Sequence, residues 1–308
     1  MRLIRGFHNL RPDHHGSALT IGNFDGLHRG HQAVLAHLRQ RADERGLVTT
    51  VMTFEPTAQE YFSPESAPAR LQRLRDKLVQ LRGLDVDQTL CLHFNRELAE
   101  MTATEFVERI LVKGLAVRYL VVGDDFRFGK DRDGDFDFLG EQGRRFGFDV
   151  VSTATFIEGD DRVSSTRVRQ ALEAGDFDTT TRLLGRPFRI CGRVSPGQQR
   201  GRTIGFHTAN IRLHRAVSPV RGVFVVKVFG LGETPVYGVA NVGNRPTVDG
   251  SYFVLEVHLF DFDQDIYGCH LDVEFCNKLR DEKKFESFEV LRKQIELDAE
   301  QARAYFSE

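Results

Sequence analysis

The segment GNFDGLHRGH, residues 22–31, decides the fold of the first half of the chain. The run SALTIGNF leads into it with apolar and β-favouring residues, and GHQAVLAHLRQRADERG follows with apolar residues at helical spacing. The segment therefore predicts a glycine-rich turn between a buried strand and a helix. Glycine allows close approach of a ligand, and a helix start offers unpaired amides at the positive end of its dipole. This is the kind of site where phosphate groups bind.

Two histidines, His28 and His31, lie three residues apart at that helix start. At this spacing they share a face of the first turn and can donate hydrogen bonds to phosphoryl oxygens. Either histidine alone has a simpler interpretation as a capping or solvated residue. The pair in this context resembles the HxGH signature of nucleotidylyltransferases, which move a nucleoside monophosphate from a triphosphate to a phosphate-bearing acceptor.

Composition limits the other classes of function. The 308 residues suffice for two domains, and 42 basic against 44 acidic residues give a formal net charge of -2, without a long block of one sign. We therefore expect neither a nucleic-acid partner nor a membrane partner. The cysteines (Cys91, Cys191, Cys269 and Cys276) form no CxxC pair, which argues against a disulfide framework or a zinc site. The N-terminus is too polar for a signal peptide and no apolar run reaches about 18 residues, which predicts a soluble cytoplasmic protein.

The order of strand-like and helix-like runs predicts two domains. From residue 17 to about 185 the two kinds alternate, as in LVTTVMTF, RLQRLRDKLVQLRG, TATEFVERILVKG and RYLVVG, which predicts a Rossmann-like α/β domain with a parallel sheet. Extended runs separated by Gly and Pro then predict a small antiparallel β-barrel, and ESFEVLRKQIELDAEQARAYF predicts a terminal helix. We place the domains at residues 1–185 and 186–308.

Two further segments of the first half can contact a nucleotide. In VGDDFRFGKDRDGD, Phe126 and Phe128 can stack on a planar ring and the basic residues can meet phosphates, although a solvated, mobile loop is the simpler alternative. In SSTRVRQAL, Arg167 and Arg169 oppose the dipole of a helix start, so an anion is expected nearby. Its serines can also act simply as helix caps.

In the second half, Thr208 and Asn210 follow a polar, glycine-rich loop. Residues i and i+2 of an extended chain face the same way, so a hydroxyl and a carboxamide oxygen converge, and such oxygens suit Mg²⁺ bound to a nucleotide. Glu256 shares the polar face of FVLEVHLFDF with His258 and is a candidate base for phosphorylation of an alcohol. Considered alone, a strand glutamate is more simply a solvated side chain.

The order GNFDGLHRGH, TFEP, VGDDFRFG, SSTRVR resembles the adenylyltransferase module of the bacterial bifunctional riboflavin kinase/FMN adenylyltransferases, the FAD synthetases of bacteria. GRTIGFHTANI, GVANVGNRPTV and LEVHLFDFDQDIYG resemble the kinase module of that family, so the resemblance covers the whole chain. It implies two Mg²⁺-dependent transfers from ATP, first to riboflavin to give FMN and then to FMN to give FAD and pyrophosphate.

The resemblance also implies residue roles. His28 and His31 serve the second transfer, Glu256 is the base of the first, and Thr208 and Asn210 contact Mg²⁺. The implied ATP-binding residues are Gly22, Asn23, Phe24, Gly26, Ser165, Thr166, Arg169, Gly201 and Arg202, and the implied flavin-binding residues are Asp125, Phe126 and Phe128.

The chain departs from the pattern of the family at three places. Thr57 and Ala58 stand where many relatives have His-Pro, and we assign them no role. Asp125 replaces an Asn that some relatives carry, and its carboxylate could weaken phosphate binding or hold a metal. His207 stands where relatives usually have Pro before Thr-Ala-Asn, and loss of proline's fixed φ should loosen that loop.

Other functions remain open at this point. Only one module could be active, or the first could use another phosphorylated alcohol as its acceptor. A flavin-sensing or flavin-carrying protein is a non-enzymatic alternative, but such a binder need not keep His28, His31, Thr208, Asn210 and Glu256. The oligomeric state is not predicted.

Overall fold

The computed structural model describes residues 1–153, 157–158, 161–195, 208–213, 217–247 and 250–307. The chain forms two compact units. One consists of Met1–Ala67 and Arg73–Val163, and the other consists of Pro68–Gln72 and Ser164–Glu308. We call them the first and second units. Within the described part of the chain, no helix is long and apolar enough to span a membrane.

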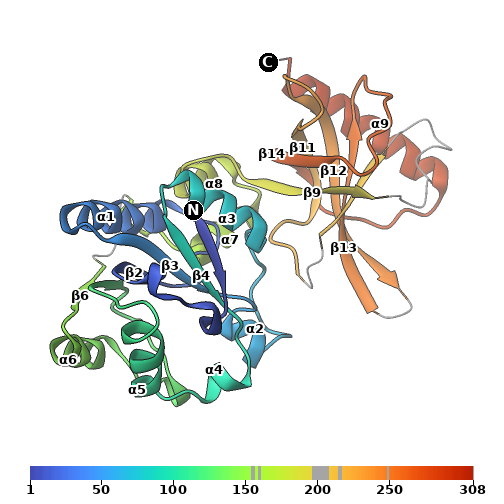
Figure 1. Cartoon of the computed structure of the whole chain (residues 1–308). Helices are drawn as coiled ribbons and strands as arrows, with labels where there is room; N and C mark the ends of the chain where they lie inside the picture. The colour runs from blue at the N-terminus through green and yellow to red at the C-terminus, as the bar shows by residue number, and fades with distance from the viewer. Residues whose placement is uncertain (154–156, 159–160, 196–207, 214–216, 248–249, 308) are drawn as a thin grey trace. The chain divides into compact units, whose positions relative to one another are not determined.

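The first unit is built on a six-stranded parallel sheet in the order β1-β4-β3-β2-β5-β6 (Figure 1). The strands are β1 (Arg2–Arg5), β2 (Ser17–Ile21), β3 (Val48–Phe54), β4 (Gln88–Leu92), β5 (Tyr119–Val122) and β6 (Asp149–Ser152). From β2 the chain builds outward to β3 and β4 on one side, and β5 and β6 lie on the other. The order of the strands thus reverses direction between β2 and β5. Ligands bind at this topological switch point in such sheets, beside the carboxyl ends of the two strands. The predicted α/β fold is confirmed.

Helices cover both faces of this sheet. On one face, Leu35 and Leu38 of α1 and Leu81 of α3 belong to the clusters that contain Val51 and Tyr119. On the other face, the segment from α5 to α6 packs against strand residues that include Leu19, Met52 and Leu90. The helices are α1 (Arg29–Arg45), α2 (Ala58–Phe62), α3 (Leu74–Gly83), α4 (Arg96–Glu100), α5 (Ala103–Phe106), a π-helical turn (Val107–Val112) and α6 (Phe136–Phe146).

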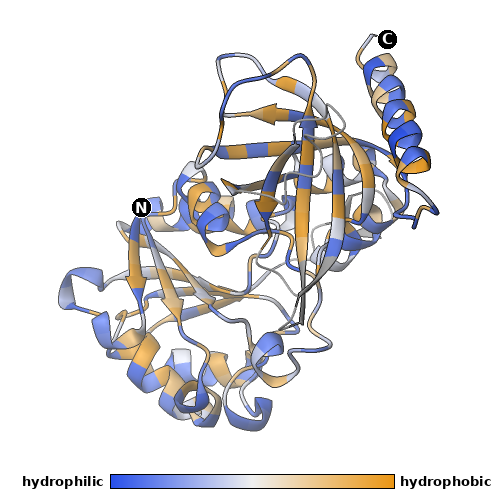
Figure 2. Cartoon of the chain, turned by 90° about the vertical axis from the view of Figure 1, so that its right-hand side faces the viewer, coloured by the Kyte–Doolittle hydropathy of each residue, from blue (hydrophilic) through white to orange (hydrophobic). Residues whose placement is uncertain are grey.

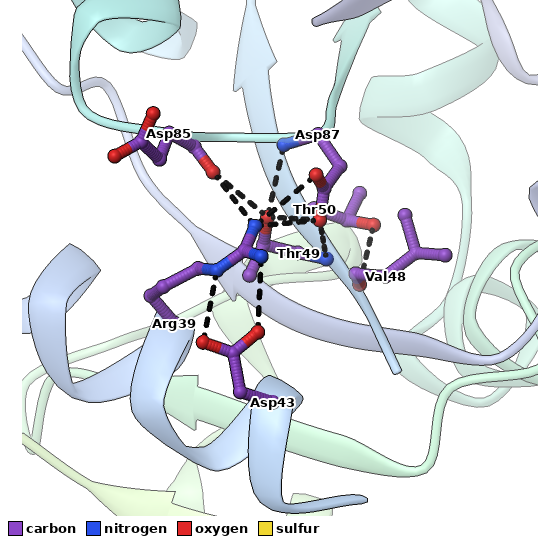
Figure 3. A network of polar contacts seen from close by, with 7 residues as sticks. All are labelled: Arg39, Asp43, Val48, Thr49, Thr50, Asp85 and Asp87. Atoms are coloured by element: carbon purple, nitrogen blue, oxygen red, sulfur yellow. Dashed lines mark hydrogen bonds and ion pairs between the residues drawn. The ribbon is translucent and has the colours of Figure 1, made fainter. Parts of the chain in front are cut away.

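A polar network ties α1 to the amino edge of the sheet (Figure 3). The Asp87 carboxylate accepts hydrogen bonds from the Thr49 amide at 2.9 Å and the Thr49 hydroxyl at 2.7 Å, and from Arg39 at 3.2 Å. Arg39 also pairs with Asp43 one turn further along α1. Because Thr49 lies at the start of β3 and Asp87 just before β4, this network holds the edge opposite to the switch point.

The second unit contains a closed barrel of antiparallel strands in the order β10-β13-β12-β11-β14-β9, as predicted. Hydrophobic and hydrophilic residues alternate along these strands in Figure 2, in keeping with one face toward the barrel interior. The strands are β9 (Arg189–Ser195), β10 (Thr208–Arg212), β11 (Gly222–Phe229), β12 (Val236–Thr247), β13 (Gly250–Leu259) and β14 (His270–Arg280). The terminal helix α9 (Phe288–Tyr305) covers the outside of β11, β12 and β14 through residues such as Ala302.

Two more helices, α7 (Ser165–Ala174) and α8 (Phe177–Leu184), belong to the second unit. Phe177 stacks on Phe275 of β14 at a ring-centroid distance of 6.1 Å and meets Phe224 of β11 edge-on. The domain boundary at 185 and 186 stays a prediction from the sequence. A short hairpin, β7 (Ile157–Glu158) with β8 (Asp161–Arg162), precedes α7.

Candidate active sites

The turn after β2 has a strained backbone that its own side chains hold in place. Phe24 and Leu27 adopt positive φ angles of 48° and 42°, which bulky residues rarely do, and Gly26 has a φ of 84°. Such strain costs about 1–3 kcal/mol per residue and persists only where the surroundings enforce it. Here Phe24 and Leu27 are 3% and 1% exposed and pack with Val51 and Leu81. The turn is thus built as a rigid element at the switch point.

His28 and His31 lie together at the end of this turn. His28 is the N-cap of α1, and its Nδ1 accepts a hydrogen bond from the His31 amide at 3.4 Å. The two rings stack at 3.7 Å between centroids, and Phe24 contacts the His31 ring at 5.0 Å. A Cβ at Gly30 would lie 3.2 Å from the His28 ring and 3.4 Å from the Val163 carbonyl, so this position favours glycine. The predicted pair is brought together, with His28 as the cap rather than inside the first turn.

His31 is held neutral by its surroundings. Its burial, followed by the charges of His28 and Lys77, keeps the pKa of His31 well below the ordinary value of 6.5. Its Nδ1 is buried and has no hydrogen-bond partner among the described residues. Buried polar atoms normally have partners, so this ring nitrogen is suited to a hydrogen bond with a bound molecule.

A cavity of about 1120 Å³ opens where the loops after β2 and β5 leave the sheet. Gly22 and Asn23 line it together with Asp125, Phe126 and Phe128, so the structure brings predicted ATP-binding and flavin-binding residues to one place. The rings of Phe126 and Phe128 stack at 5.4 Å. Five further aromatic residues complete the wall, namely Phe54, Tyr61, Phe62, Phe94 and Phe106. Neither histidine is among the described residues that line this cavity.

Backbone hydrogen bonds order the loop after β5. Phe128 and Gly134 exchange two N–H···O bonds of 3.0 Å each, and the Lys130 amide donates to the Met101 carbonyl at 2.8 Å. This geometry favours the ligand-binding interpretation over a solvated loop, because it fixes Phe128 at 8% exposure while the loop still faces the cavity.

The start of α7 follows the predicted capping pattern. Ser164 is the N-cap and accepts from the Arg167 amide at 3.3 Å, and Gly175 ends the helix in the left-handed conformation. Ser165 and Thr166 lie in the first turn, and Arg169 Nε donates to the Ala69 carbonyl at 2.6 Å. These residues belong to the second unit, and their contact with a triphosphate stays a prediction.

The barrel places the predicted kinase residues side by side on its outer surface. In the strand register Asn210 of β10 lies opposite Glu256 of β13, and Thr208 lies opposite His258. Ala209 and Ile211, which alternate with these residues along β10, are buried, whereas Thr208 is exposed. The Asn210 side-chain amide donates to the Thr208 carbonyl at 3.3 Å through its nitrogen, so its carboxamide oxygen takes no part in this bond. Gly201, Arg202 and His207 lie outside the described residues.

Sequence reasoning missed Asn241 and Glu282. Asn241 of β12 lies opposite Glu256, on the other side from Asn210. Its side chain hydrogen-bonds the Glu282 carboxylate, which lies directly over Gly243. Burial, with a contribution from the Glu256 charge, raises the pKa of Glu282 above its ordinary value. No motif marks Glu282, because it follows β14 in a charge-rich segment and reaches the site only through the fold.

Sequence reasoning also missed Lys77, which is 4% exposed in α3. The signal was present: Lys77 follows Leu74 by three residues and precedes Leu81 by four, so it falls on the apolar face of that helix. A lysine on such a face is unusual and indicates a specific partner. Thr57, at a departure from the family pattern, caps α2 in a capping box with Glu60.

Comparisons with known proteins agree with this architecture. Residues 10–167 match the FAD synthetase family and residues 184–306 match the riboflavin kinase family. The chain is 52% identical over 307 residues to a bifunctional riboflavin kinase/FMN adenylyltransferase of Haemophilus influenzae, covering 100% of both chains. It is 53% identical to the protein of the same description from Pseudomonas fluorescens, with 99% and 97% covered. A crystal structure described as a macrolide-efflux protein from Streptococcus pneumoniae is similar with a TM-score of 0.78 and 30% identity, over 98% of this chain and 99% of that one.

Proposed function

The chain belongs to the bifunctional riboflavin kinase/FMN adenylyltransferase family and synthesises FMN and FAD, and we propose that these two reactions divide between its two halves. Residues 1–185 adenylylate FMN, and residues 186–308 phosphorylate riboflavin. ATP is a substrate of both reactions. The observation that carries the assignment of the first half is the cavity at the switch point, where the turn that bears the histidines meets an aromatic wall.

In the first half, the phosphate of FMN attacks the α-phosphorus of ATP in line, and pyrophosphate leaves. His28, His31 and the amides at the start of α1 stabilise the charge that develops on the leaving group. Gly22, Asn23, Phe24 and Gly26 shape the turn that receives the triphosphate. Ser165, Thr166 and Arg169 hold the triphosphate from α7. The aromatic wall, with Phe126 and Phe128, holds the isoalloxazine ring by stacking.

In the barrel, Glu256 accepts the proton of the ribityl 5'-hydroxyl as the phosphoryl group is transferred from ATP. Asn210 and Asn241 flank Glu256 across the strands, which supports this role because both can orient its carboxylate. General-base assistance of this kind is typically worth about 10²- to 10⁴-fold in rate.

Thr208 and Asn210 would hold Mg²⁺ with the phosphates of ATP. Their neutral oxygens fit the ion, since Mg²⁺ usually keeps several waters and takes few protein ligands in nucleotide sites. Among the described residues no group of three or more His, Cys, Asp or Glu side chains could hold a metal ion. The ion would neutralise charge on the transferred phosphoryl group.

The test is to incubate the protein with riboflavin, ATP and Mg²⁺ and to separate the flavins by chromatography, beside His31→Ala and Glu256→Ala. His31→Ala should accumulate FMN, and Glu256→Ala should form FAD only when FMN is supplied. Each variant is the control for the other, because each should keep the reaction of the other half. If both variants lose both reactions while they stay folded, the division between the halves is wrong.

A further inference from the structure

A buried lysine lies beneath the turn that carries the histidines. Lys77 Nζ donates a hydrogen bond to the Asn23 carbonyl at 2.6 Å and lies 3.5 Å from the Thr53 hydroxyl. At 4% exposure its ammonium group is removed from water, which is costly unless its hydrogen bonds are satisfied. The fold therefore brings a buried charge into contact with a carbonyl of this turn.

The position of that carbonyl matters for the shape of the turn. Asn23 precedes Phe24, the first of the two bulky residues with positive φ. In a trans peptide the C=O and the following N–H point in opposite directions, so fixing the Asn23 carbonyl also fixes the direction of the Phe24 amide. The Thr53 hydroxyl adds a longer bond to the same carbonyl at 3.4 Å. Lys77 thus holds a strained peptide in place. Without this hydrogen bond the peptide could relax to backbone conformations of lower energy.

We propose that Lys77 is a positioning residue for FMN adenylylation, which holds the turn at residues 22–28 in the shape that receives the triphosphate. The inference rests on the proposed role of this turn and of His31. It assigns no contact between Lys77 and substrate.

A second effect of Lys77 reaches His31. The ammonium charge contributes, after burial and His28, to the lowered pKa of the His31 ring. The charges of His28 at the cap and of Lys77 in α3 act on the ring, and Phe24 is its apolar neighbour. Lys77 therefore adds to the effect of burial in lowering the pKa of His31, in addition to fixing the backbone before it.

The test compares Lys77→Met and Lys77→Arg in the full-length chain, with Arg75→Met as the control. Arg75 is an exposed cation on the same helix, so its loss changes the net charge equally without touching the turn. Lys77→Met should lower kcat for FMN adenylylation by about 10²-fold, the range for a misplaced reacting group. Lys77→Arg should recover part of this loss, because it keeps the charge but not the compact donor. Arg75→Met should match the unchanged protein.

Three readouts accompany the rate, and the first two separate positioning from a general loss of structure. Riboflavin phosphorylation, measured in the same sample, should be unchanged in Lys77→Met, and thermal unfolding should show the first unit folded at the assay temperature. The His31 ring, followed by NMR through a pH titration, should titrate at higher pH in Lys77→Met than in the unchanged protein. Arg75→Met, which leaves the surroundings of the ring unchanged, should not move that titration.

The inference is overturned if folded Lys77→Met adenylylates FMN within about threefold of the unchanged rate, a change too small for a positioning role. An unchanged His31 titration would contradict only the effect of the Lys77 charge on that ring. His31→Ala distinguishes this failure from that of the proposed function. If His31→Ala still makes FAD, the role of the turn is wrong; if His31→Ala is inactive and Lys77→Met is active, only the role of Lys77 is wrong.

Discussion

Replacement of His28 by asparagine separates its role as a helix cap from its role in the chemistry. The cap bond from the His31 amide to His28 Nδ1 is 3.4 Å long, at the limit for a hydrogen bond, so it contributes about 0.5 kcal/mol, the low end for N-caps. Asparagine is among the best N-cap residues and alanine among the worst. His28→Asn should therefore keep the cap of α1, and His28→Ala should lose it, while both lose the ring that stacks on His31 at 3.7 Å.

If the ring stabilises the leaving pyrophosphate, both variants should lose about 10²- to 10³-fold in kcat for FMN adenylylation, as for removal of one donor at a developing charge. Their free energies of unfolding should differ from each other by only about 0.5 kcal/mol, since the loss of ring packing is common to both. Steady-state FAD formation from FMN and ATP gives the rates, and riboflavin phosphorylation by the same sample controls for active protein. Near-normal adenylylation by His28→Asn would refute the reasoning, because it would reduce His28 to a cap.

Three further predictions concern pH, an ion pair and a close contact. Because the folded pKa of His31 lies well below 6.5, the unfolded chain binds a proton first as the pH falls, so the free energy of unfolding of the first unit should decrease below about pH 6.5. His31→Gln should flatten this slope in thermal unfolding, and an equal slope in both proteins would contradict it. Asp298→Asn removes the carboxylate that lies 2.7 Å from the Arg280 guanidinium. Because the Asp298 side chain is only 3% exposed, the free energy of unfolding measured with denaturant should fall by about 3–5 kcal/mol. A loss below about 1 kcal/mol would place that pair in the class of solvated ones. Gly243→Ala puts a Cβ against the Glu282 carboxylate, which ends a flexible side chain, so stability should change by less than about 1 kcal/mol. The displaced carboxylate should lower kcat for riboflavin phosphorylation about tenfold, and an unchanged kcat would separate Glu282 from the kinase site.

The parallel sheet could be predicted because its inner strands carry their own signal. β3 and β5 read as continuous apolar or β-branched runs, which is typical of strands buried on both faces. The strand β1 was missed, since RLIR is short and half charged and forms through its pairing with residues 88–91. The helix α6 was missed as well. It contains Gly140 and Gly143, which weaken a helix, and Gly143 is needed because a Cβ there would lie 2.5 Å from the Phe148 carbonyl.

The boundaries of helix α3 show a second limit. The leucine spacing in RLQRLRDKLVQLRG predicts a helix that includes Leu71, but the helix begins at Leu74, and Leu71 is buried outside it. The spacing of apolar residues predicts which side chains are buried. It does not distinguish a residue inside a helix from one in the adjoining turn.

Local motifs predicted the parts of the sites that lie on one or two segments. The register that sets Asn210 beside Glu256 follows from two such segments. The residues that were missed come from elsewhere in the chain: Tyr61 of α2 reaches the cavity wall, and Lys77 reaches the turn from α3. Such residues act by position in the fold, and no spacing in the sequence records which carbonyl or ring they will meet.

The two sites differ in side-chain chemistry because their nucleophiles differ in ionisation. The phosphate of FMN, a monoester with a second pKa near 6, is already charged at neutral pH and needs no base. A carboxylate beside it would repel it, so a site for this acceptor is better served by donors, such as the neutral His31 and the amides at the start of α1. The ribityl hydroxyl of riboflavin keeps its proton at neutral pH. This proton must pass to an acceptor such as Glu256 when the hydroxyl attacks. Under the proposed assignment, donors in the first half and a carboxylate in the barrel therefore follow from one difference, that between a phosphate and an alcohol as the attacking group.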